Sequence, residues 1–386
     1  MSTALIAREI FTGQDIQTGK AVLVREGKIT DIVPVADIPS NYRTRDLPGY
    51  LLAPAFIDLQ IYGGNGLLFS AELSTAALEA TYEYCLEGGC TQFMITLATN
   101  AIEKFIHGLE VAREYRSNGG KGLLGVHLEG PYINPAKRGA HLEKFIKTPT
   151  TEEISLLLQK GKDVFRMMTL APERCDRTCI DLLISNGIIV SAGHSNATYE
   201  EAAAGFYQGI PAATHLFNAM SPFHHRAPGA VGAALIDERL TVSLIADGVH
   251  AHPAALNLVL RAKGAQGIVL VTDAVAAAGA PAGTYVLGGA PIISDGESAR
   301  RPDGTLAGST LTMDRAVRGM VALGGARPEE ALTMATAVPA ALLGFADRGR
   351  LTVGRRADLA LWSEDLKLTA TTVGGVVAFG AAPRPL

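Results

Sequence analysis

The chain has few of the residues and patterns that mark secreted, membrane-spanning or thiolate-metal proteins. Its 386 residues contain four cysteines, and neither close pair has Cys-x-x-Cys spacing: Cys85, Cys90, Cys175 and Cys179. We therefore expect free thiols in a reducing cytoplasm. No stretch approaches the ~20 unbroken apolar residues that a membrane span requires. Arg8 and Glu9 interrupt the segment that a signal peptide would need to be apolar, so we expect a cytoplasmic protein.

Charge of neither sign dominates the chain. Its 34 Lys and Arg residues against 38 Asp and Glu residues give a net charge of −4 and a sequence pI near 6.2. This balance gives no electrostatic reason to expect nucleic acid or an anionic membrane as a partner, so any anion site must be local. Hydrophobic residues make up 48% and charged residues 19%, as in a well-buried globular enzyme.

Apolar runs of strand length recur from about residue 51 onward, with helix-like segments between them. Runs that are apolar on both faces and separated by helices indicate a parallel sheet covered on both sides. Eight such units in roughly 250 residues predict a closed (β/α)8 barrel of the TIM type. The expected strands are residues 52–61, 90–98, 123–129, 165–171, 188–194, 211–215, 241–247 and 268–273, and the expected helices include residues 74–88, 101–117, 151–159, 199–208 and 253–263.

The two ends of the chain differ from this repeating part. Residues 1–50 and 346–386 alternate apolar and polar residues in short runs, with a hairpin turn expected at Gly27-Lys28. Neither end can bury a core alone, so we expect both to pair as antiparallel strands in one small β-sandwich domain. The barrel would then comprise residues 51–345. The stretch 281–308 is rich in Gly and Pro and is expected to form a hairpin or lid over the pocket.

Polar residues close several of the expected strands. Glu129, His194, His215, Asp247 and Asp273 each end an apolar run. Barrel active sites are built at the carboxyl ends of the strands, so these five side chains are expected at one mouth. An arbitrary scatter of polar residues would not place all five there.

Three of these residues form a candidate metal site. The carboxylate of Glu129 and the imidazoles of His194 and His215 suit a borderline divalent ion and leave a coordination position open for water. The set has no thiolate and favours Zn2+, while Fe2+, Mn2+ and Co2+ are also compatible with it. A salt bridge at Glu129 and hydrogen-bonded histidines are the alternatives. Three such groups together favour one metal ion per subunit.

Asp273 is the candidate general base. Metal coordination lowers the pKa of a bound water to about 7, and a nearby carboxylate can take its proton and later deliver it to a departing amine. The alternative is a carboxylate that supports a loop. Many metal hydrolases carry His-x-His on the first strand, whereas this chain has Gln60 and Tyr62 at those positions. A second metal ion is therefore not expected.

Further histidines and a basic loop surround this set. His127 lies two residues before Glu129 and either supports the ligands or is a hydrogen-bonded barrel histidine, which we prefer slightly. His141 and His250 place imidazoles at the barrel mouth. The His-His-Arg segment at residues 224–226 either captures a phosphate or carboxylate or is a solvated basic loop, and its spacing leaves both open.

With these motifs together, the chain resembles the N-acetylglucosamine-6-phosphate deacetylases of the amidohydrolase superfamily over essentially its whole length. HLEGP together with THLFNAM is highly specific within that superfamily. The segments that carry the resemblance are HLEGPY (127–132), GAH (139–141), SAGHS (191–195), ATHLFNAM (213–220), RAPG (226–229), ADGVH (246–250), VTDA (271–274), GTLAGS (304–309) and GRLTVGRRADLALW (349–362).

The resemblance implies hydrolysis of the acetamide of N-acetyl-D-glucosamine 6-phosphate to D-glucosamine 6-phosphate and acetate. It implies that Glu129, His194 and His215 bind the metal, that Asp273 acts as base and then as acid, and that the protein is a homodimer. In that dimer, Arg226 would reach the phosphate in the neighbouring active site. Contacts with the phosphosugar are implied for Ala140, His141, Asn218, Ala219, Arg226, His250, Leu306, Ala307 and Gly308.

Two departures from the family pattern stand out. Gln60 and Tyr62 replace the His-x-His of members that hold two metals, and Ala227 replaces an acidic residue that often follows the arginine, which is expected to loosen the phosphate loop. The rival hypotheses are a deacetylase of another phosphorylated N-acetylhexosamine, such as N-acetylgalactosamine 6-phosphate, a cyclic-amide hydrolase of the same superfamily, and a non-catalytic sugar-phosphate-binding homologue. The presence of all three ligands and the base argues against the last.

Overall fold

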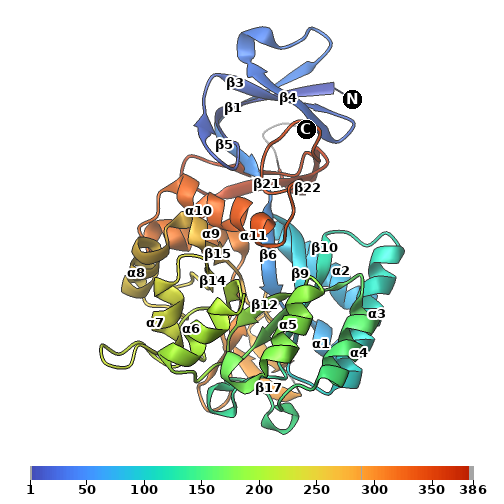
Figure 1. Ribbon diagram of the computed structural model, residues 1–386. Coiled ribbons are helices and arrows are strands. Elements are labelled where there is room, and N and C mark those ends of the chain that lie inside the picture. The colour runs from blue at the N-terminus through green and yellow to red at the C-terminus, as the bar shows by residue number, and fades with distance from the viewer. Residues whose placement is uncertain (1, 288, 382–386) are drawn as a thin grey trace.

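Eight parallel strands form a barrel at the centre of the computed structural model, which describes residues 2–287 and 289–381 (Figure 1). In spatial order the strands run from β15 back to β6, each beside its neighbour in sequence. The seam closes where the backbone N–H of Asp273 donates to the carbonyl oxygen of Gln60 (2.9 Å). The strands are β6 (Phe56–Ile61), β9 (Cys90–Ala98), β10 (Leu123–Glu129), β11 (Phe165–Leu170), β12 (Ile189–Ala192), β13 (Ala212–Ala213), β14 (Thr241–Leu244) and β15 (Ile268–Leu270).

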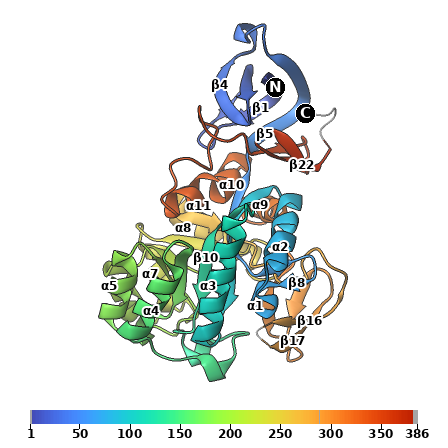
Figure 2. The same cartoon turned by 90° about the vertical axis from the view of Figure 1, so that its right-hand side faces the viewer.

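Helices alternate with these strands and cover the outside of the barrel (Figures 1 and 2). Their starts follow capping chemistry: Thr198 and Glu201 form a capping box at the start of α6, and Thr150 accepts the N–H of Glu153 at the start of α4. This arrangement confirms the expected (β/α)8 barrel. The covering helices are α2 (Thr75–Glu87), α3 (Ile102–Ser117), α4 (Thr151–Gly161), α5 (Arg177–Ser185), α6 (Tyr199–Tyr207), α7 (Gly229–Ile236), α8 (Pro253–Lys263) and α9 (Met313–Ala322).

Three of these helices, α5, α7 and α9, are additional to the five that the sequence pattern indicates. Helix α7 has the sequence GAVGAALI, and six of its eight residues are buried. A helix that is apolar on nearly all sides has no 3.6-residue alternation to reveal it. Helix α9 is separated from β15 by an inserted sheet, so the regular strand–helix spacing is lost there.

Four of the strands end earlier than the sequence pattern predicts. The ladder stops at Ala192, Ala213, Leu244 and Leu270, before the polar residues expected to close those strands. The backbone leaves the extended conformation soon afterwards, with positive φ angles of 48° at His194, 32° at His215 and 55° at Asp273. Apolar character thus continues beyond the last strand residue, because these short turns are also buried.

A second sheet is built from both ends of the chain, with its strands in the order β22-β21-β20-β5-β1-β3-β4 and β2 beside β1 (Figure 1). Residues 1 and 382–386 of the expected β domain lie outside the described residues. Alternate residues of β1 enter different apolar clusters, Leu5 and Ala7 in one and Ala4 in the other. The strands are β1 (Ser2–Phe11), β2 (Ile16–Gln17), β3 (Lys20–Arg25), β4 (Lys28–Pro34), β5 (Arg43–Pro54), β20 (Leu359–Trp362), β21 (Leu368–Val373) and β22 (Val376–Gly380).

The expectation of purely antiparallel strands in this sheet is wrong at one pair. Strands β1 and β5 run parallel, because the chain crosses over between β4 and β5 through a 3-10 helix at Val35–Asp37. A parallel pair requires such a crossover, whereas the β3–β4 pair is joined by a tight hairpin at Glu26-Gly27.

A four-stranded antiparallel sheet is inserted between β15 and α9. It lies at the end of the barrel remote from the terminal β sheet (Figures 1 and 2). We call this sheet, comprising β16 (Gly283–Leu287), β17 (Ala290–Ser294), β18 (Ser298–Arg300) and β19 (Leu306–Ser309), the lid sheet. The remaining elements are β7 (Gly63–Gly64), β8 (Leu67–Leu68), α1 (Phe69–Glu72), α10 (Pro328–Ala335), α11 (Ala337–Leu342) and 3-10 turns at Pro135–Lys137, Glu143–Phe145, Pro172–Arg174 and Ala265–Gly267. Within the described residues, no helix has both the length and the apolar character needed to cross a bilayer.

Candidate active site

A cavity of about 300 Å3 opens at the carboxyl ends of the barrel strands, beneath the lid sheet. Arg226 does not line it, because that residue lies on an exposed loop between β13 and α7, where His224 and Ala227 form a tight bridge. The structure brings the other expected site residues together in the cavity wall: Glu129, Ala140, His141, His194, His215, Asn218, Ala219, His250, Asp273, Leu306, Ala307 and Gly308.

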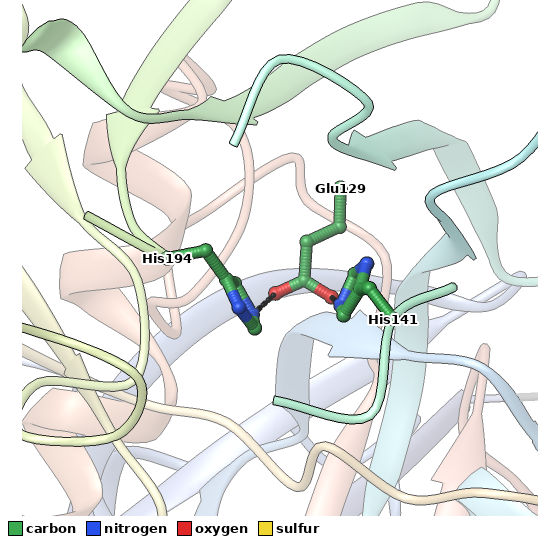
Figure 3. Close-up of side chains that lie close together, drawn as sticks. All are labelled: Glu129, His141 and His194. Atoms are coloured by element: carbon green, nitrogen blue, oxygen red, sulfur yellow. Dashed lines mark ion pairs between the residues drawn. The ribbon is translucent and has the colours of Figure 1, made fainter. Parts of the chain in front are cut away.

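The carboxylate of Glu129 is the centre of this site. It is 1% exposed, and three histidines approach it through their Nε2 atoms. His194 and His215 lie 3.3 and 3.0 Å from Oε1, and His141 lies 3.3 Å from Oε2. Figure 3 shows His141 and His194 on opposite sides of the carboxylate. Among the described residues, the ligand atoms of Glu129, His141 and His194 lie within 4.8 Å of one another and could hold a metal ion.

The hydrogen-bond partners of the histidines assign different tautomers to two of them. Nδ1 of His194 lies 2.8 Å from the carbonyl oxygen of Lys137, which can only accept, so Nδ1 carries the proton and Nε2 has a free lone pair. Nδ1 of His141 instead accepts the backbone N–H of Thr99 (3.2 Å), so the proton of the neutral ring is on Nε2. The hydroxyl of Thr99 can turn either way and does not decide the assignment.

These tautomers test whether the site suits a cation. When the His194 ring is neutral, the lone pair of its Nε2 faces a carboxylate oxygen of Glu129 at 3.3 Å. Both atoms are acceptors, and no proton lies between them to make a hydrogen bond. Nε2 of His215 lies 3.0 Å from the same oxygen, and its Nδ1 is buried without a partner among the described residues. A divalent ion bound by carboxylate and imidazole resolves this contact, so these residues fit a metal. His141 does not offer a lone pair there.

Gln60 and Tyr62 occupy the positions of the missing His-x-His as hydrogen-bond donors. The side-chain nitrogen of Gln60 donates to Oε1 of Glu129 (3.0 Å) and to Oδ1 of Asp273 (2.9 Å). The hydroxyl of Tyr62 donates to Oε2 of Glu129. Both donors stabilise negative charge on Glu129 without adding a ligand atom, and Gln60 ties the two carboxylates together.

The pKa values of the two carboxyl groups of the site are shifted in opposite directions. Burial raises the pKa of Asp273 well above its ordinary value, and the nearby charge of Glu129 adds to this effect, although His215 opposes it. Burial also raises the pKa of Glu129, but contacts with His141, His194 and His215 outweigh it and hold that pKa well below its usual range. Glu129 is therefore the fixed anion of the pair, and Asp273 the group that can hold a proton.

Strained backbone positions the reacting groups. The positive φ angles of His194, His215 and Asp273 are rarely adopted by residues with side chains, and such strain concentrates at functional sites. Asp273 is held from the lid side as well, where its carbonyl oxygen accepts the N–H of Ser309 (2.9 Å). Gly308 permits this approach, since a Cβ there would lie 2.9 Å from that carbonyl oxygen.

Two other histidines, His127 and His250, have hydrogen-bond partners of their own. Both ring nitrogens of His127 have partners, the carbonyl oxygen of Leu59 at 3.2 Å and the hydroxyl of Thr169 at 2.7 Å, and burial lowers its pKa to about 3. It is thus a neutral, hydrogen-bonded barrel residue. His250 lines the cavity and contacts Oδ2 of Asp247 through Nδ1 at 2.6 Å, so the carboxylate at the seventh strand orients an imidazole.

Two groups that orient the site histidines carry no sequence signal. Thr99 follows β9 and fixes His141, which lies in the loop after β10. The carbonyl oxygen of Lys137 fixes His194 after β12. Both contacts depend on how the loop at residues 130–142 folds over the barrel mouth, and neither threonine nor a backbone carbonyl stands out in a motif.

Comparisons with known proteins agree with this geometry. The amidohydrolase family model matches residues 51–378, and a NagA composite domain matches residues 3–52. The chain is 36% identical to N-acetylglucosamine-6-phosphate deacetylase of Haemophilus influenzae, over 97% of this chain and 99% of that protein. It is 35% identical to N-acetylgalactosamine-6-phosphate deacetylase of Escherichia coli O157:H7, over 98% and 100% of the two chains.

A solved structure is similar over nearly the whole fold. It is an aspartate-to-alanine mutant of N-acetyl-D-glucosamine-6-phosphate deacetylase from Mycobacterium smegmatis, in complex with N-acetyl-D-glucosamine-6-phosphate. Its TM-score is 0.91 at 32% identity, over 97% of this chain and 99% of that chain. The chain therefore belongs to the amidohydrolase family and, within it, to the group that contains the N-acetylglucosamine-6-phosphate deacetylases.

Proposed function

We propose that the protein hydrolyses the acetamide of N-acetyl-D-glucosamine 6-phosphate to D-glucosamine 6-phosphate and acetate, with one divalent metal ion per subunit. The observation that carries this proposal is the carboxylate–imidazole cluster of Glu129, His194 and His215 beside the buried carboxyl of Asp273. Full-length similarity to deacetylases of phosphorylated hexosamines supports the substrate class. We assign residues 51–345 to the catalytic barrel and residues 1–50 and 346–386 to the β domain.

We assign Glu129, His194 and His215 as the metal ligands. His194 presents a free lone pair to the Glu129 carboxylate, and His215 lies 3.0 Å from the same oxygen. Carboxylate and imidazole ligands without thiolate favour Zn2+, with Fe2+, Mn2+ or Co2+ as substitutes. When bound, such an ion polarises a carbonyl oxygen and makes a water molecule acidic near neutral pH.

Asp273 carries the proton in this mechanism. A buried carboxyl with a raised pKa is a suitable base, because it can take a proton from the attacking water and still release it. The released proton goes to the amide nitrogen, and the amine leaves. Gln60 holds Asp273 and Glu129 at fixed positions through one side-chain nitrogen. His141 lines the cavity with a protonated Nε2 that lies 3.3 Å from Oε2 of Glu129, and we assign this N–H as the donor to the acetyl oxygen of the bound substrate.

The phosphosugar is held by several backbone and side-chain groups. We assign Asn218 and Ala219 of the loop after β13, together with His250, to the sugar phosphate. The remaining wall of the sugar pocket consists of Ala140 and three lid-sheet residues, Leu306, Ala307 and Gly308.

Arg226 is proposed to act in a neighbouring subunit. It is exposed and outside the cavity of its own chain, so its guanidinium is free to bind the phosphate across the interface of a homodimer. The loop that carries it also exposes Phe223, which is 55% exposed, and an exposed aromatic side chain is suited to burial in such an interface.

A subunit-mixing experiment tests this assignment. Arg226→Met and Asp273→Asn variants should each be nearly inactive alone. Mixed under conditions that allow subunit exchange, they should regain activity, because one site of each mixed dimer then combines an intact Asp273 with an intact Arg226. Absence of recovery, despite exchange shown by differently tagged subunits, would contradict a shared site.

A second candidate substrate is N-acetyl-D-galactosamine 6-phosphate, because a relative at 35% identity is named for it. Acetate release from the purified, metal-loaded protein should be measured with both 6-phosphates and with unphosphorylated N-acetylglucosamine. We expect the highest kcat/KM with the glucosamine compound and a large loss without phosphate. Higher kcat/KM with the galactosamine compound would favour the alternative, and equal rates without phosphate would contradict a phosphosugar site.

A further inference from the structure

A second cavity, of about 320 Å3, lies at the opposite end of the barrel from the candidate active site. Its walls are the amino ends of β6, β9 and β10 and residues 347–358, which connect α11 to β20. Figure 1 shows this end of the barrel facing the terminal β sheet. Strand β10 runs from Leu123 at this cavity to Glu129 at the other, a span of roughly 20 Å at strand rise.

Four arginines line this cavity, and two of them are already neutralised. Nε of Arg348 lies 3.2 Å from Asp347, and Nε of Arg356 lies 2.8 Å from both carboxylate oxygens of Asp358. The other two, Arg350 and Arg355, form no ion pair with any carboxylate of the described residues. The cavity therefore has a local excess of positive charge, although the whole chain is weakly acidic.

The cavity also contains buried polar atoms that lack partners. Nε of Arg355 and the side-chain oxygen of Gln92 are both buried without a hydrogen bond among the described residues. Among the residues that the structure describes, the Arg350 guanidinium has one hydrogen bond, a long one of 3.4 Å to the side chain of Gln14. Native proteins rarely leave buried donors unpaired, because each costs about 1–3 kcal/mol in lost hydration. The unpaired Nε of Arg355 is such a donor, and together with the exposed guanidinium of Arg350 it can bind an anion. The Gln92 oxygen is an acceptor and can bind only a hydroxyl group of the same ligand.

We propose that this cavity binds the phosphoryl group of a small metabolite through Arg350 and Arg355. The planar guanidinium fork matches phosphate oxygens in a bidentate manner, and the volume suits a small ligand. Binding would join the 347–358 segment to the barrel strands and stabilise the junction between the barrel and the terminal sheet. The site is separate from the catalytic cavity and does not depend on the proposed function.

Calorimetric titration of the metal-loaded protein with inorganic phosphate tests the proposal. Because the proposed function gives the catalytic site a phosphate contact through Arg226, the titration is done in an Arg226→Met background. Arg350→Met/Arg355→Met is then added, and Arg177→Met/Arg239→Met, which removes two exposed arginines elsewhere, is the charge-matched control. We expect the cavity variant to weaken phosphate binding about tenfold or more, and the control to leave it unchanged.

Two further measurements test whether the cavity variant folds and which anion the cavity binds. Deacetylase activity of the cavity variant, measured with Arg226 restored, should stay close to that of the native chain and shows that the protein folds. If that variant does not fold, Arg355→Lys replaces it, since it keeps the charge but loses the bidentate fork, and is also expected to weaken binding. Equal phosphate affinity in a folded cavity variant overturns the proposal. Binding of citrate but not of phosphate or glucose 6-phosphate would overturn the phosphoryl assignment.

Discussion

His141 and His194 approach the same Glu129 carboxylate through Nε2 at 3.3 Å, with ring centroids 4.4 Å apart, but only His141 carries its proton on that nitrogen. Distance alone makes the two residues equivalent as metal ligands. His141 accepts a backbone N–H through Nδ1 and is therefore a hydrogen-bond donor at Nε2, whereas Nδ1 of His194 faces a carbonyl oxygen, which leaves a lone pair on Nε2 that can bind a cation.

Asparagine substitutions should separate these two roles. His194→Asn is expected to lose most of the bound metal, because it removes one of the three proposed ligands. His141→Asn should retain close to one metal ion per chain and lose about 10²-fold or more in kcat. Elemental analysis and acetate release measure the two properties, with the exposed His107→Asn as the control. Metal loss in His141→Asn with metal retained in His194→Asn would show that the tautomers are reversed.

Replacing Asp273 by Asn should stop proton transfer while leaving the metal in place. We expect kcat to fall by about 10²–10⁴-fold, since an amide cannot take the proton of the attacking water. The metal content should be unchanged, because Asp273 is not among the assigned ligands. Asp303→Asn, at an exposed turn of the lid sheet, is the matched control. Near-normal turnover in Asp273→Asn would be incompatible with its role as base.

The double variant Gln60→His/Tyr62→His should create a second metal position. It replaces two hydrogen-bond donors against Glu129 with the His-x-His ligands that two-metal members of the superfamily carry. Metal content is expected to rise from about one ion per chain toward two, as measured by elemental analysis. Gln14→His/Tyr207→His adds the same residues at the surface and should leave the content at one. A native chain that already holds two ions would contradict the single-metal site.

Asp58 is expected to make the stability of the fold depend on pH. It is 1% exposed beneath Gln60 and Asp273, and burial raises its pKa to about 7, although it accepts the N–H groups of Gln60 and Thr272. A carboxyl whose pKa is raised on folding stabilises the folded state most below its unfolded pKa of about 4. This contribution is lost as the pH rises toward 7 and amounts to a few kcal/mol in order of magnitude.

Urea unfolding at several pH values tests this sign. Between about pH 4 and 7, the free energy of unfolding of the native chain should fall relative to that of Asp58→Asn, which does not titrate. Asp46→Asn, an exposed carboxyl in β5, should follow the native curve. Parallel curves for the native chain and Asp58→Asn would show that Asp58 stays charged in the barrel.

The strands and the central residues of the site were predictable because both leave a signal along the chain. A parallel barrel needs apolar runs at regular intervals, and its active site needs polar groups after them, so Glu129, His194, His215 and Asp273 could be found by position alone. The difference in tautomer between His141 and His194 could not, because it depends on Thr99 and Lys137 in separate loops. Helix α7 could not be predicted, because it is buried on nearly all sides and its sequence shows no alternation of apolar and polar residues.

The terminal sheet has a consequence for how the protein is made. Strand β5 pairs with β20, and Leu52 lies opposite Leu361, so one strand of this sheet is synthesised before the barrel and its partner after it. During that interval, the edge of β5 has no partner and exposes unpaired backbone groups that can join another chain. The nascent barrel therefore keeps an unpaired strand edge until β20 has left the ribosome. Pausing synthesis before β20 has left the ribosome should increase aggregation, and a pause after β20 has emerged should not.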